Sequence, residues 1–278
     1  MANDDKYPVE SDRRRFVKGV VGASAVAALG ATGAAAVNTA TTPAGVGGGI
    51  TQFMGVDLVS GPAPRGMPQI PVELDDDGYL RGIWPEVQEE EIEGETVLIA
   101  ESEIGDVTYS ASWFYYCGGQ TFPGTAPDAD QDNYIRYSQP MYDWQADHEP
   151  GDRVHVDHFD DYDDWDNNIG SPGMGKPGRC RWRSEDVGPA ETLPVQVIRS
   201  GMIEEAAQDD EWVAASTAEG FMAIANMCTH FCCVPSWKGT AESEQFGTGD
   251  EIYCQCHQSV YDPFTIYEQQ FVALPRED

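Results

Sequence analysis

Two short segments near the C-terminus combine cysteine and histidine in a pattern suited to metal binding. Residues 228–233 read CTHFCC, and residues 254–259 read CQCHQS. Two cysteines and two histidines form an ordinary tetrahedral zinc set, so a zinc site is one interpretation. Each segment, however, supplies both kinds of ligand, whereas zinc sites of this type usually pair like ligands across a turn. A binuclear iron cluster binds two thiolates on one iron and two imidazoles on the other, so the mixed segments favour it.

These segments resemble the cluster-binding loops of Rieske iron-sulfur proteins from cytochrome bc-type complexes, which read CTHLGC and CPCHGS. The resemblance covers the C-terminal part of the chain and implies one [2Fe-2S] cluster. It assigns the thiolates of Cys228 and Cys254 and the imidazoles of His230 and His257 as cluster ligands. It also implies a disulfide between the loops, Cys233 to Cys256, and hydroxyl donors to the sulfurs from Ser259 and Tyr261. The two ligand histidines also receive a catalytic role, because they can accept the proton of a quinol.

Four positions depart from the family loops. Phe231 and Cys232 stand where the family has Leu and Gly, and Gln255 and Gln258 stand where it has Pro and Gly. Glycine marks backbone conformations that other residues adopt only at a cost, so Cys232 and Gln258 predict altered loop dihedrals. The proline-containing third loop of the family has a candidate counterpart in residues 271–275 (FVALP).

The chain has seven cysteines, so at least one thiol is free, metal-bound or paired with another molecule. Cys232 competes with Cys233 for Cys256, and the spacing of the family loop assigns the bond to Cys233. Cys117 and Cys180 are candidates for a second disulfide that staples the middle of the chain. The sequence leaves the pairing of Cys117, Cys180 and Cys232 open.

Acidic residues outnumber basic ones by 48 to 16, which gives a formal charge of −32. Such a field repels nucleic acid and anionic lipid, so we expect no nucleic-acid partner. The acid is spread along the whole chain, which indicates adaptation to molar salt and a halophilic source. Residues 155–161 (HVDHFDD) set two histidines among carboxylates and could bind a cation. A solvated acidic loop is the better interpretation in so acidic a chain.

The N-terminus carries signals for export and for membrane attachment. Residues 12–18 (DRRRFVK) resemble a twin-arginine export signal, and an uncharged apolar run follows at residues 19–37. The run is long enough to cross a bilayer as a helix, but its Ala, Gly and Val content makes insertion marginal. It is either a signal cleaved near residues 34–36 or a retained anchor. The family resemblance favours the anchor.

The rest of the chain predicts an all-β fold. Short apolar segments alternate with turn formers, which predicts strands at residues 96–100, 195–199, 211–215, 220–227 and 251–253. Residues 117–190 are dense in Gly, Pro and Asp and read as a loop-rich acidic insertion whose role the sequence does not indicate. We predict a cytoplasmic segment at 1–18, a transmembrane anchor or signal helix at 19–39 and a Gly-rich flexible tether at 40–53. The resemblance implies a Rieske domain of stacked antiparallel sheets at 54–278. Within it we expect a small cluster-binding subdomain at about 225–263.

The resemblance implies a function at the outer face of a cell membrane. The chain would be the iron-sulfur subunit of a quinol-oxidising complex, active only with its cytochrome b subunit. It would take one electron from quinol and deliver it to an outer-face cytochrome or blue copper protein. The alternatives are the small Rieske subunit of an arsenite-oxidase-like molybdenum enzyme, a Rieske ferredoxin or dioxygenase component, and a secreted zinc-stabilised module. The midpoint potential, the quinone and the electron acceptor are not encoded in any motif.

The charge predicts that stability depends on salt. When salt falls from molar to about 0.1 M, the Debye length grows from about 3 to about 10 Å, and the carboxylates repel one another over a longer range. We therefore expect the melting temperature to fall steeply as potassium chloride is removed. Thermal unfolding followed by circular dichroism across a salt series measures this. A melting temperature independent of salt would contradict the halophilic interpretation.

Overall fold

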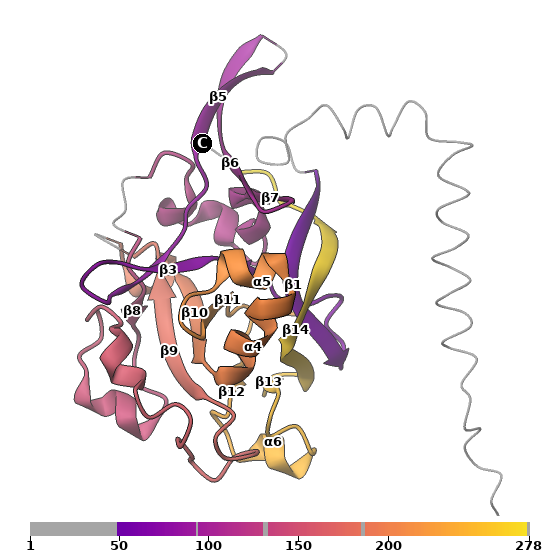
Figure 1. Cartoon of the computed structure of the whole chain (residues 1–278). Coiled ribbons are helices and arrows are strands. Elements are labelled where there is room, and N and C mark those ends of the chain that lie inside the picture. Colours follow the sequence, from indigo (N-terminus) through magenta and orange to yellow (C-terminus); the bar gives the residue numbers. More distant parts are fainter. Residues whose placement is uncertain (1–48, 93, 130–132, 185–186, 277–278) are drawn as a thin grey trace, which may run out of the picture. The chain divides into compact units, whose positions relative to one another are not determined.

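Antiparallel β-sheet makes up most of the regular structure in the computed structural model (Figure 1). The structure describes residues 49–276, apart from 93, 130–132 and 185–186. This agrees with the all-β prediction in its broad form, with few helices added. The expected export signal, the anchor helix at 19–39 and the tether as far as residue 48 lie outside the described residues. None of the helices in the described part has the length and apolar character that a membrane span requires.

The largest sheet has five strands in the order β2-β11-β10-β9-β8. Its strand β11 is a continuous apolar run, and every residue of the sequence FMAIA is buried. A strand buried on both faces needs such a continuous run, which explains why the sequence predicted it well. The strands are β2 (Gln69–Ile70), β11 (Phe221–Ala225), β10 (Leu193–Arg199), β9 (Lys176–Trp182) and β8 (Arg136–Tyr137).

A second sheet of four strands has the order β1-β14-β13-β12 and carries the second Cys/His segment. The strands are β1 (Ile50–Ser60), β14 (Ser259–Val272), β13 (Ile252–Cys254) and β12 (Ser236–Trp237). Cys254 pairs with Ser259, so residues 255–258 form the turn between β13 and β14. Residues 50–53, which we assigned to the end of the tether, lie instead in β1, where Thr51 and Phe53 are buried.

Two smaller sheets complete the β-structure. One joins β3 (Val72–Leu74) to β4 (Leu80–Gly82), and the other has β6 (Glu95–Ile104) between β5 (Val87–Ile92) and β7 (Val107–Ser110). Figure 1 shows β5 and β6 as a hairpin that extends beyond the neighbouring strands. The predicted strand at residues 96–100 lies within β6.

The strand predicted at residues 211–215 is wrong, because this segment is helix α5 (Glu211–Ser216). The Asp210 carboxylate caps the helix by accepting a hydrogen bond of 2.9 Å from the Val213 N–H. Trp212 and Ser216, one turn apart, are both buried, which a helix achieves on one face. The other α-helices are α4 (Gly201–Asp209) and α6 (Glu242–Gln245).

The region predicted to be loop-rich, residues 117–190, contains mainly loops and short 3-10 turns in its described part. Strand β9, however, pairs with β10 along seven residues, so this region also completes the main sheet. The chain forms six described 3-10 turns: η1 (Ala111–Phe114), η2 (Gly119–Thr121), η3 (Pro123–Thr125), η4 (Asp143–Asp147), η5 (Val156–Phe159) and η6 (Pro189–Glu191).

The two histidines weighed as cation ligands make protein hydrogen bonds instead. His155 Nδ1 accepts from the Asp157 N–H, and its Nε2 lies 2.8 Å from the Asp77 carbonyl oxygen. His158 Nδ1 lies 2.9 Å from the Tyr137 hydroxyl. Both nitrogens of His155 and the Nδ1 of His158 therefore have protein partners, as expected for histidines of a solvated acidic loop.

The buried Trp182 ring packs directly against Gly82 in the core. Trp182 is fully buried, and a Cβ atom on Gly82 would lie 2.4 Å from Trp182 Cε2. Glycine is therefore required here for space, because the indole ring occupies the volume of any larger side chain.

Gly82→Ala should lower the free energy of unfolding by about 1 to 3 kcal/mol through overpacking. Gly188→Ala is the matched control, because its Cβ would meet only the Glu191 carboxylate at 3.5 Å. Denaturant unfolding of both variants at fixed salt measures the difference. Equal stability of the two variants would show that the core yields to the extra methyl group.

Candidate metal centre

The two Cys/His segments form loops with the same backbone design. The first follows β11, where the Asn226 side chain donates a hydrogen bond of 2.8 Å to the Pro235 carbonyl across the base of the loop. The Cys232 N–H bonds to the Cys228 carbonyl at 2.9 Å, closing the first loop. In the second loop the Gln258 N–H bonds to the Cys254 carbonyl at 2.8 Å.

The residue that closes each loop has a left-handed backbone. Cys232 and Gln258 both have φ = 61°. Both residues adopt the conformation that glycine favours, at positions where the family loops have glycine. A non-glycine residue in this region costs roughly 1 to 2 kcal/mol, so the contacts around each loop must offset that strain.

Two disulfides attach the first loop to its surroundings. Cys233 and Cys256 are bonded, the pair that the family resemblance implied, and they join the two loops. Cys117 is bonded to Cys232 rather than to Cys180, which corrects the candidate pairing. Cys180 is a free thiol, 1% exposed, opposite Val195 in the main sheet. Its side chain is therefore held in the core of the main sheet.

The sulfurs of Cys228 and Cys254 lie side by side and buried. The Cys254 thiol donates a hydrogen bond to the Cys228 sulfur, and the Tyr261 hydroxyl donates another at 3.1 Å. These bonds, with further ones from the His230 N–H and the Ser259 hydroxyl, lower the pKa of Cys228 well below its usual range although burial opposes the shift. Sharing its proton with Cys228 raises the pKa of Cys254. The pocket thus favours a negative sulfur.

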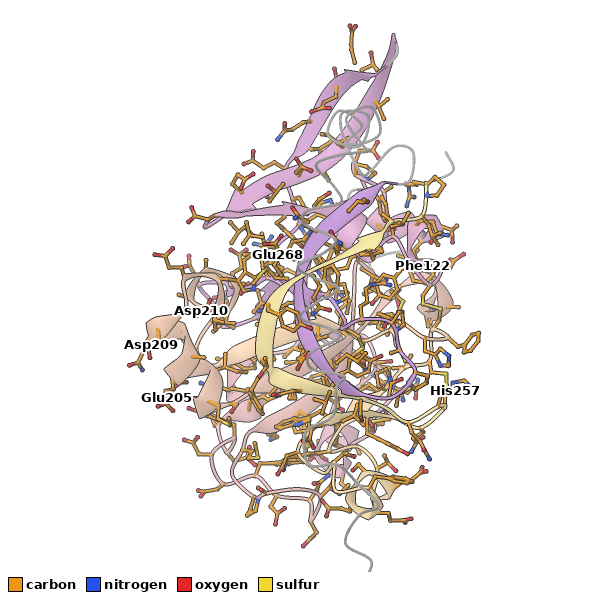
Figure 2. All side chains as sticks on the ribbon, turned by 90° about the vertical axis from the view of Figure 1, so that its right-hand side faces the viewer. Phe122, Glu205, Asp209, Asp210, His257 and Glu268 are labelled. Carbon is orange, nitrogen blue, oxygen red and sulfur yellow. A yellow bond between two sulfur atoms is a disulfide. The ribbon has the colours of Figure 1, made fainter. Side chains whose placement is uncertain are left out.

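The two imidazoles form a second pair beside the sulfurs. The ring centroids of His230 and His257 are 4.7 Å apart at an angle of 81°, and the Phe231 ring lies 4.2 Å from His230. His257 is exposed and lies at the periphery in Figure 2. His230 Nδ1 is buried without a hydrogen-bond partner in the described part of the chain. A buried unsatisfied nitrogen is costly, and a metal ion would satisfy it.

The expected ligands do not converge on one point. Within the described residues, the one group of three metal-binding side chains with ligand atoms within 4.8 Å of one another is Cys233, Cys254 and Cys256. The disulfide between Cys233 and Cys256 removes two of these as thiolate ligands. Ligand atoms around a single tetrahedral ion lie roughly 3.3 to 3.8 Å apart. The four predicted ligands, Cys228, His230, Cys254 and His257, do not form such a group in the part of the chain that the structure describes.

Residues 61–65 (GPAPR) contact both loops and were missed in the sequence. Ser259 Oγ accepts a hydrogen bond from the Ala63 N–H, and the Thr229 hydroxyl donates to the Arg65 carbonyl at 2.6 Å. A Cβ on Gly61 would lie 2.5 Å from Ser259 Cα, so only glycine allows this approach. A proline-containing segment that follows β1 therefore lies against both loops, while the assignment of residues 271–275 to a third loop stays a prediction. The two prolines of residues 61–65 were the available signal.

Comparison with known proteins gives no independent assignment. No family model, curated protein or solved structure matches the chain. The candidate centre is defined by its own residues and geometry.

Cys117→Ser should release Cys232 and lower the free energy of unfolding by about 2 to 5 kcal/mol, because the bond closes a long loop. Thiol titration of the denatured, unreduced chain should rise from three free cysteines (Cys180, Cys228 and Cys254) to four. Reduced samples of both proteins are the control and should unfold alike. An unchanged thiol count in the variant would contradict the bond.

Proposed function

We propose that this chain carries a [2Fe-2S] cluster on Cys228, Cys254, His230 and His257. In this proposal it is the iron-sulfur subunit of a quinol-oxidising cytochrome bc-type complex. The observation that carries the proposal is the donor set: two buried, hydrogen-bonded sulfurs beside two imidazoles, one of which has a buried nitrogen without a partner.

When bound, such a cluster exchanges one electron at a potential between roughly −150 and +300 mV. The protein groups around it favour the negative charge that an added electron brings. The Tyr261 hydroxyl and the His230 N–H donate to the Cys228 sulfur, and N–H groups of residues 256 and 257 donate to the Cys254 sulfur. Donors to the sulfurs raise the potential toward the range in which quinols are oxidised.

The exposed side of the site provides contact with a substrate or partner. His257 is exposed, and Phe231 beside it is 66% exposed. An imidazole that uses one nitrogen for metal can accept a quinol proton with the other. The Phe231 ring offers an apolar surface for the quinol or for the cytochrome b subunit.

Attachment to the membrane and delivery of the electron complete the proposal. Residues 19–39 serve as a single-pass anchor, and the domain lies on the extracytoplasmic face. The acceptor is a cytochrome or a blue copper protein of that compartment. The twin-arginine segment supports export of a folded, cofactor-loaded chain.

Electron paramagnetic resonance of the purified full chain tests the proposal. We expect an iron-sulfur signal after reduction, because adding one electron to the oxidised, diamagnetic cluster leaves an unpaired spin. Cys254→Ser should lose the signal. Cys180→Ser is the matched control and should keep it, because Cys180 is also buried but lies in the main sheet. A colourless, silent wild-type chain would refute the proposal.

Tyr261→Phe should lower the midpoint potential by about 20 to 60 mV. This range is the one-electron equivalent of one hydrogen bond worth about 0.5 to 1.5 kcal/mol. Tyr267→Phe is the control on the same strand, because its hydroxyl bonds instead to the Asp57 carboxylate at 3.0 Å. Redox titration of both variants measures the shifts. Equal potentials in the wild type and Tyr261→Phe would show that this hydroxyl does not tune the site.

A further inference from the structure

A hollow of about 280 Å³ lies behind the first loop, beside the Cys117–Cys232 disulfide. Part of its wall is formed by apolar side chains. Figure 2 shows one of them, Phe122, on the same side of the view as His257. The polar part of the wall includes Arg179 and Arg181 of β9 and Asn226 at the base of the loop.

Asn226 brings an unsatisfied acceptor to this wall. The residue is 1% exposed, and its Nδ2 donates a hydrogen bond of 2.8 Å to the Pro235 carbonyl. That bond fixes the orientation of the amide, because only the nitrogen can donate. Asn226 Oδ1 is then a buried acceptor without a partner in the described residues. Leaving it so costs about 1 to 3 kcal/mol, and a ligand hydrogen would remove the cost.

Arg179 and Arg181 bring positive charge to the same wall. They are two residues apart on β9, so their side chains lie on one face of the sheet. Neither guanidinium forms an ion pair across the part of the chain that the structure describes, although the sequence has 48 acidic residues. Arg181 Nε is buried without a hydrogen bond.

We propose that this hollow binds a small oxyanion that also carries a hydroxyl hydrogen, either hydrogenphosphate or a short hydroxycarboxylate. The guanidiniums of Arg179 and Arg181 donate to the charged oxygens, for which their planar fork is suited. Asn226 Oδ1 accepts the hydroxyl hydrogen. The site is independent of metal binding, so it stands or falls separately from the proposed electron-transfer function.

Isothermal titration calorimetry on the full chain, at one fixed high concentration of potassium chloride, tests the site near neutral pH. Inorganic phosphate is paired with sulfate, and glycolate is paired with acetate. The second member of each pair has similar charged oxygens but no hydroxyl hydrogen. We expect phosphate to bind more tightly than sulfate, or glycolate more tightly than acetate, and the pair that responds identifies the source of the oxyanion. No binding by any of the four, or equal affinities within both pairs, would overturn the proposal.

Substitution of the guanidiniums locates the binding. Arg181→Gln should weaken the affinity about tenfold or more, because it removes charge-assisted hydrogen bonds, and Arg181→Lys should recover part of the loss. Arg81→Gln is the matched control, since Arg81 pairs with Glu73 outside the hollow, and it should bind as the wild type does. Thermal unfolding of each variant checks the fold. If a folded Arg181→Gln protein binds with wild-type affinity, the site is not this hollow.

Discussion

The candidate centre depends on contacts that hold two short loops against each other. These contacts keep the buried sulfurs of Cys228 and Cys254 within hydrogen-bonding distance of each other. Neither loop has a core of its own, and each is closed by a residue with strained backbone. The disulfide Cys233–Cys256, the β13–β14 hairpin and the segment at residues 61–65 supply the restraint. Cross-links suit such loops because they remove entropy from the unfolded chain without requiring apolar burial.

Hydrogen bonding decides the chemistry of the sulfurs more than the net charge of the protein does. An acidic surface and burial both oppose a negative sulfur. Donors from Tyr261, Ser259 and the loop backbone reverse this locally, since charge-assisted hydrogen bonds are strong where water is excluded. At molar salt the distant carboxylates are screened, so these short contacts dominate. The same locality explains how an arginine-lined hollow can exist in so acidic a chain.

Local sequence patterns predicted those features that depend on neighbouring residues. The apolar runs at 96–100 and 195–199 lie in β6 and β10, and the predicted strands at 220–227 and 251–253 overlap β11 and β13. The strand prediction at 211–215 failed because the segment forms a helix that Asp210 caps. Its buried residues, Trp212, Val213 and the following Ser216, have the spacing of one helix face. The pairing of Cys117 with Cys232 could not be predicted from local patterns. The two residues are 115 positions apart in the sequence, and only the tertiary fold brings them together.

In the proposed centre, two sulfurs and two imidazoles of this chain hold a pair of iron atoms. Elemental analysis of iron and zinc, combined with an assay of acid-labile sulfide on the same purified sample, tests it most directly. We predict about two iron atoms and about two sulfides per chain, without zinc. Stoichiometric zinc with no labile sulfide would contradict it.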